Sequence, residues 1–242
     1  MEIFYGKPTS NTFFDILDQY SEKEINSIKT STIPLLNYWK NTEERVLSFL
    51  NEIAVPSAPL ILNFEYPTRS HGSNKASMSD IMVFGDNWKA AIEAKYTEIK
   101  YVYETVKNWN KDKSQNRSNV VDHWLHILQP FLTKPLIEEE ISEIPYQFLH
   151  RVASSCEGNT EFAWTVYQVF YDQDTESKLG NFKNLLSSSV RYLNPKSNLK
   201  IFLHIVKTEL LMPNAEVNGI LGRLKENDIY AFGEEQFEQL LP

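Results

Sequence analysis

Cysteine is almost absent from this chain of 242 residues, which holds Cys156 alone. A single thiol excludes an internal disulfide and a cysteine-rich zinc site, and it is typical of a protein from a reducing compartment. Cys156 follows two serines where a helix is expected to end. A catalytic thiol would need a neighbouring base, and this context favours an incidental cysteine.

Glycine is also scarce, with eight residues in the chain. None of them belongs to a phosphate-binding loop of the Walker type or to a G-x-G-x-x-G sequence, so a nucleotide cofactor is poorly supported. Gly-x-Ser-x-Gly is missing too, which removes the support for an α/β-hydrolase. The chemistry of this chain must be sought in other residue types.

Long apolar runs are missing as well, since no stretch reaches 18 apolar residues. The first 14 residues lack a basic segment followed by an apolar one, which a secretory signal would require. We therefore expect a soluble, cytoplasmic protein with no membrane partner. Hydrophobic residues make up 42% of the chain, enough for a sizeable core.

Positive charge is in deficit, with 24 basic against 32 acidic residues and a net charge of −8. This balance argues against a protein that coats nucleic acid through charge alone. It leaves room for an enzyme that acts on nucleic acid, because basic loops and a bound metal ion can dominate the potential at a cleft.

The most informative stretch reads as a β-hairpin from residue 79 to residue 95. Two mostly apolar runs flank the turn residues Gly85, Asp86 and Asn87. If the turn is Asp86-Asn87 alone, Asp80 at the start of the first strand lies opposite Glu93 at the end of the second. A three-residue loop would shift this pairing by one residue. Lys95 projects from the same face as Glu93 because side chains alternate along a strand.

The first of these registers brings two carboxylates and an ammonium group together. Asp80 and Glu93 repel each other unless a proton or a cation lies between them, and Mg²⁺ accepts one or two carboxylates in its shell. Such an ion polarises a phosphodiester and activates water, while Lys95 could orient that water. The competing interpretation is a solvated cross-strand ion pair worth a few tenths of a kcal/mol.

At these residues the chain resembles the PD-(D/E)XK nuclease superfamily. Asp80 matches the first acid of the family pattern, and Glu93-Ala94-Lys95 matches its Glu-x-Lys element, although Ser79 stands where the pattern has proline. The resemblance covers about 60 residues, from Thr42 to Tyr101. Glu98-Ile99-Lys100 is a second Glu-x-Lys, but Glu93 is preferred because it ends an apolar strand.

The resemblance implies an α/β fold of the restriction-endonuclease-like type, with a mixed central β-sheet flanked by helices. It also implies a Mg²⁺-dependent nuclease that hydrolyses DNA, most simply as an endonuclease, with Mn²⁺ able to substitute. Asp80 and Glu93 would hold the ion and Lys95 would position the attacking water. A catalytically silent subunit of the same fold that binds DNA or protein is the alternative. DNA versus RNA, exonuclease versus endonuclease, and homodimer versus monomer stay open.

A helical glutamate often completes such a metal site, and the resemblance assigns that place to Glu43, with Glu44 second. Helical spacing predicts one helix from Thr32 to the residues before Pro56, with Glu43 on its apolar stripe. An acid on such a stripe needs a partner or a functional reason, although a surface acid at the edge of the core is the alternative. Glu65, on the strand expected at residues 60–66, is a reserve acidic ligand.

Three residues are candidates for contact with substrate. Arg69 and Lys75 lie with His71 in a polar, net-basic loop that leads into Asp80, where they could touch phosphates. Gln129 is an accessory candidate, because in several branches of the superfamily a polar residue on a following helix assists the site. His123 and His126 lack a third nitrogen or sulfur ligand at a recognisable spacing, so a zinc site is disfavoured.

We expect one domain over residues 1–242, with a catalytic core at about residues 33–132 and further sheet and helix elements at 133–242. Strand-forming residues predict strands at 162–171 and 199–206. Helical patterns predict helices at 97–109, 119–132, 146–153, 178–192 and 214–225. The alternation of strands and helices indicates a layered α/β domain.

Overall fold

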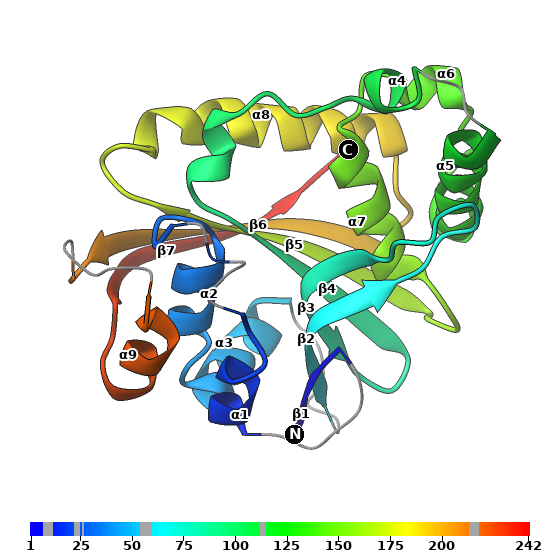
Figure 1. The fold of residues 1–242 in the computed structure, drawn as a ribbon. Coiled ribbons are helices and arrows are strands. Elements are labelled where there is room, and N and C mark those ends of the chain that lie inside the picture. Colours follow the sequence, from blue (N-terminus) through cyan, green and yellow to red (C-terminus); the bar gives the residue numbers. More distant parts are fainter. Residues whose placement is uncertain (7–11, 22–24, 26, 54–59, 112–114, 213–217) are drawn as a thin grey trace.

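One mixed sheet runs through the whole protein (Figure 1). The computed structural model describes residues 1–6, 12–21, 25, 27–53, 60–111, 115–212 and 218–242. Its seven strands lie side by side in chain order: β1 (Glu2–Tyr5), β2 (Ile61–Thr68), β3 (Ser77–Phe84), β4 (Trp88–Lys95), β5 (Phe162–Tyr171), β6 (Leu199–Leu210) and β7 (Tyr230–Leu240).

Strand directions divide the sheet into an antiparallel part and a parallel part. β2, β3 and β4 form an antiparallel meander, and β4, β5 and β6 are parallel. β1 joins one edge parallel to β2, while β7 joins the other edge antiparallel to β6. The parallel strands need crossover connections, and helices supply them. The expected mixed α/β sheet is confirmed.

Helices cover both faces of the sheet (Figure 1). One layer contains α1 (Phe13–Leu17), α2 (Thr32–Tyr38), α3 (Thr42–Ile53) and α9 (Ile220–Glu226), and the other contains α5 (Gln115–Leu128), α7 (Tyr146–Cys156) and α8 (Glu176–Leu193). Side chains alternate between these layers, so Trp164 and Val166 of β5 enter the core with α2 and α3, whereas Tyr167 and Val169 enter the core with α7 and α8. Among the helices in the described part of the chain, none is long and apolar enough to cross a membrane.

The single helix expected from Thr32 onwards is wrong, because the chain turns between α2 and α3. The Thr42 hydroxyl donates to the Trp39 carbonyl at 2.7 Å, at the point where the first helix ends. The turn rotates the second helix relative to the first. Val46 and Leu50 of α3 remain buried, whereas Leu47 is 59% exposed and Glu43 points to solvent.

The helix expected at residues 97–109 is also wrong. A 3₁₀ turn, η2 (Thr97–Lys100), is followed by an extended segment and then by the short α4 (Val106–Trp109). The segment pairs with the chain before α7, since Val106 N–H donates to the Ile144 carbonyl and Tyr146 N–H to the Glu104 carbonyl. Tertiary hydrogen bonds therefore override a local helical pattern.

Other elements agree with expectation within a few residues. β5 has the predicted bounds, and β6 extends four residues beyond its predicted end. The helix expected at 119–132 begins earlier, as α5, and ends in the 3₁₀ turn η3 (Gln129–Phe131), while a four-residue helix, α6 (Glu138–Ile141), was not expected. The start of the helix expected at 214–225 lies outside the described residues, and α9 is its described part.

Candidate active site

The hairpin of β3 and β4 adopts the first of the two expected registers. Ile81 pairs with Ile92 and Phe84 with Lys89, and Gly85 N–H donates to the Trp88 carbonyl at 3.0 Å. A Cβ at position 85 would lie 2.2 Å from the indole ring that follows the turn, so glycine fits this position. The same register places the residue before Ile81, which is Asp80, beside Glu93.

Asp80 lies where the paired ladder between β3 and β4 ends. Its Oδ2 accepts the Ala94 N–H at 2.7 Å, so a carboxylate takes the place of a strand carbonyl. Burial, followed by the negative charge of Glu93, raises the pKa of Asp80 from its ordinary 3.8 to about 8. The side chain is partly exposed, so a proton or a cation can reach it from solvent.

Glu93 is a buried carboxylate between two cations. Its Oε1 accepts from Lys95 Nζ at 2.6 Å, and its Oε2 lies 2.5 Å from Arg151 Nε. Burial opposes its ionisation, but the charges of Arg151 and Lys95 hold the pKa of Glu93 below its usual range. The side chains of Glu93 and Lys95 are 3% and 7% exposed, so the interpretation as a solvated surface pair is wrong for these two residues.

Helix α7 supplies two residues that the sequence reasoning missed. Gln147 Nε2 donates to Glu93 Oε1 at 2.9 Å, and Arg151 lies one helical turn further along the same face. Arg151 also donates to the Met78 carbonyl and to Ser79 Oγ. The signal for Arg151 was present in the sequence, because a charged residue among the apolar residues of a helix needs a partner.

The acid expected on a helix is not brought to this site. Glu43 and Glu44 are exposed in the first turn of α3, and within the described part of the chain neither contacts Asp80 or Glu93. The reserve candidate Glu65 lies much nearer, because the pairs Phe64–Ile81 and Tyr66–Ser79 flank it and place it beside Asp80. Glu65 has a left-handed backbone, with φ at 51° within β2, and its charge also contributes to raising the pKa of Asp80.

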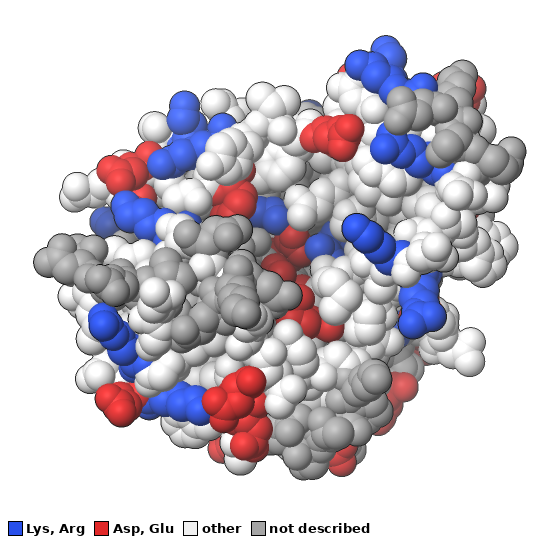
Figure 2. All heavy atoms as spheres, in the orientation of Figure 1, with Lys and Arg blue, Asp and Glu red and all other residues white. Residues whose placement is uncertain are grey.

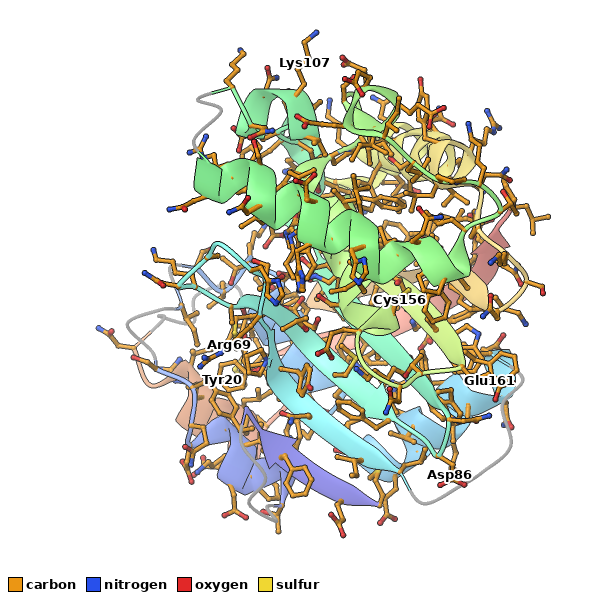
Figure 3. All side chains as sticks on the ribbon, turned by 90° about the vertical axis from the view of Figure 1, so that its right-hand side faces the viewer. Tyr20, Arg69, Asp86, Lys107, Cys156 and Glu161 are labelled. Atoms are coloured by element: carbon orange, nitrogen blue, oxygen red, sulfur yellow. The ribbon has the colours of Figure 1, made fainter. Side chains whose placement is uncertain are left out.

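The loop between β2 and β3 stands at the same end of the hairpin as Asp80. Figure 3 shows Arg69 at the end of the sheet away from Asp86, which marks the hairpin turn. Arg69 and Lys75 are exposed, and the ring of His71 stacks on that of His123 from α5 with centroids 4.2 Å apart. Arg69 and Lys75 are thus accessible from solvent at the end of the hairpin that carries Asp80.

Gln129 lies in η3, after the end of α5, and is partly buried. The amide that contacts Glu93 belongs to Gln147 of α7. The accessory role that the resemblance implied for Gln129 stays a prediction.

Glu98, the acid of the second Glu-x-Lys sequence, has a structural task. Its carboxylate accepts from Ser31 N–H at 3.1 Å, from Ser31 Oγ at 2.9 Å and from Tyr96 N–H at 2.8 Å. These bonds fasten the start of α2 to the end of β4. Lys100, the other charge of that sequence, is exposed. The geometry therefore favours Glu93 and Lys95 over the second pair.

A model of one protein family matches residues 10–210 of the chain. The chain belongs to this family, a domain of unknown function (DUF6946). No curated protein and no solved structure matches the chain. The matched range includes Asp80, Glu93, Lys95 and the two residues of α7, whereas strand β7 lies beyond it.

Asp80 and Glu93 are the candidate residues for holding a cation in this DUF6946 domain. In the residues that the structure describes, no group of three or more His, Cys, Asp or Glu side chains is disposed to hold a metal. Mg²⁺ needs only one or two carboxylates and keeps water on its other positions, and Asp80 and Glu93 supply that number. Figure 2 shows acidic atoms gathered near the centre of one face beside basic atoms.

Proposed function

We propose that this protein is a Mg²⁺-dependent nuclease of the restriction-endonuclease-like type that hydrolyses phosphodiester bonds in DNA. The observation that carries the proposal is the convergence of Asp80, Glu93 and Lys95 where the ladder between β3 and β4 ends. The mixed sheet and the antiparallel meander that presents these residues support it. A fold alone does not establish a function.

Each residue has a separate task in this proposal. Asp80 and Glu93 would hold Mg²⁺, for which Mn²⁺ can substitute, and the bound ion would supply a polarised phosphodiester and an acidified water. Burial, followed by the negative charge of Glu93, raises the pKa of Asp80, and a bound cation would relieve the repulsion between the two carboxylates. Lys95 donates to the attacking water and offsets negative charge that builds on the phosphate. Glu65 adds negative charge beside Asp80, which favours a cation there.

A second candidate is a catalytically silent subunit that keeps the fold to bind DNA or protein. Its specific support is that Lys95 and Arg151 already neutralise Glu93. The net charge of −8 also disfavours strong binding of nucleic acid through charge alone. Turnover separates this candidate from the first.

Plasmid nicking tests the proposal. We expect supercoiled DNA to be nicked by the wild type with Mg²⁺ or Mn²⁺ and to stay intact with EDTA. Glu93→Gln and Lys95→Met preserve the side-chain shapes and should lower the rate at least about a hundredfold, because each removes a charged group that acts on the transition state.

Asp86→Asn is the matched control, since Asp86 is an exposed acid in the turn of the same hairpin. It should nick at the wild-type rate. Thermal unfolding of each variant shows whether a lost rate reflects a lost fold. Nicking that survives Glu93→Gln at the wild-type rate would refute the site, and metal binding without any nicking would favour the silent subunit.

A further inference from the structure

The site contains a buried cation, Arg151, that has no role in the proposed hydrolysis. Arg151 is 4% exposed, and a guanidinium does not lose its proton in proteins. It lies between Glu93 Oε2 at 2.5 Å and two acceptors of β3, the Met78 carbonyl and Ser79 Oγ. A charge held this far from solvent is costly unless it is fully paired, so its partners are informative.

Both oxygens of Glu93 face cations, but Oε2 accepts no hydrogen bond from the residues that the structure describes. Oε1 accepts from Lys95 and Gln147, and Oε2 faces Arg151. A divalent cation that binds Oε2 would therefore take the place of Arg151, the group that faces this oxygen. Two ligands that exclude each other at one site lower each other's affinity by the same factor. Arg151 and a divalent cation compete for Glu93, so each should lower the affinity of the other for this carboxylate.

A guanidinium released from Glu93 needs another acceptor, because an unpaired buried charge is strongly unfavourable. A phosphodiester oxygen is the acceptor that the proposed substrate would bring to this place. The planar guanidinium matches phosphate with two parallel N–H groups, which an ammonium group cannot do. Lys95, on the other side of Glu93, keeps its bond to Oε1 and has two further N–H groups that can act on water.

We infer that Arg151 holds Glu93 while no divalent cation is bound and takes a phosphate oxygen of the substrate once one is bound. The inference rests on the proposed function and adds a substrate-binding residue to it. In the rival account Arg151 has a structural role only, and its hydrogen bonds to Met78 and Ser79 hold α7 against the start of β3.

Two titrations of the full-length protein distinguish these accounts. Calorimetry with Mn²⁺ compares the wild type with Arg151→Gln, and the variant should bind Mn²⁺ about tenfold more tightly because a competitor is gone. The dinucleotide dTpdT is then titrated in Ca²⁺, and its affinity should fall about tenfold in the same variant. A purely structural role would weaken both ligands together.

Arg151→Lys keeps the charge and guards against loss of folding in the glutamine variant. It should bind Mn²⁺ within a few-fold of the wild type and still lose affinity for dTpdT, because it lacks the planar fork. Undiminished dTpdT affinity in Arg151→Lys overturns the inference, as does unchanged or weaker Mn²⁺ binding in Arg151→Gln. If neither the wild type nor Arg151→Gln binds Mn²⁺, the proposed function itself is wrong.

Discussion

The ionisation of Asp80 depends strongly on its surroundings. Its pKa of about 8 means that the folded chain keeps a proton which the unfolded chain, with an ordinary pKa of 3.8, has lost. The folded state therefore binds more protons between these two values. The contribution of Asp80 to stability falls as the pH rises from about 4 to about 8, because its deprotonation favours the unfolded chain.

Asp80→Asn should remove this dependence. Measured by urea unfolding in EDTA, the variant should match the wild type near pH 4 and exceed it at pH 8.5 by about 2 kcal/mol, a value below the full linkage energy because Asp80 is partly exposed. Asparagine keeps an oxygen for the Ala94 N–H. A stability difference that does not change with pH would contradict the account of Asp80.

At the scale of residues, the sequence predicted some members of the site and missed others. Asp80, Glu93 and Lys95 were found because a hairpin with polar ends fixes which residues face each other. Arg151 and Gln147 were not found, because nothing local indicates that α7 lies across β4. Glu43 was misplaced, since the turn after Trp39 rotates the helix that carries it.

At the scale of elements, Glu98 connects the end of β4 to the start of α2 through hydrogen bonds. Its carboxylate accepts three hydrogen bonds, two from Ser31 and one from Tyr96. The groups are partly buried, so removing their acceptor leaves donors without partners.

Glu98→Ala should therefore lower the free energy of unfolding by about 2 kcal/mol while leaving Mn²⁺ affinity within a factor of two. Urea unfolding and calorimetry measure the two effects. Glu139→Ala, on the exposed face of α6, is the matched control and should shift stability by less than about 0.5 kcal/mol. Loss of Mn²⁺ binding in a folded Glu98→Ala variant would instead favour Glu98 and Lys100 as the Glu-x-Lys residues of the metal site.

Elements with a strong period were predicted well, and those held by distant partners were not. β5 matches its predicted range because ten consecutive residues have strand composition. The segment after β4 does not, because Tyr101 and Val102 are 70% and 98% exposed and its backbone pairs with the chain before α7. β7 was missed because residues 233–236 are polar and exposed on an edge strand.

The whole molecule is a sheet with two helical layers, and the site lies where several of its parts meet. The meander β2–β4 presents the acids, α7 from one layer brings Gln147 and Arg151, and the loop after β2 brings Arg69 and Lys75 to the same end. The layered α/β fold followed from the order of strands and helices. A homodimer, which concerted cleavage of both DNA strands would require, stays a prediction.

The central claim is that Asp80 and Glu93 together hold a divalent cation, and calorimetric titration with Mn²⁺ tests it most directly. The wild type should bind Mn²⁺, and Asp80→Asn should bind it at least about tenfold more weakly, because one of two carboxylate ligands is gone. Asp86→Asn, at the other end of the hairpin, should bind it as the wild type does. Absence of binding to the wild type, or equal binding by Asp80→Asn, would contradict the account.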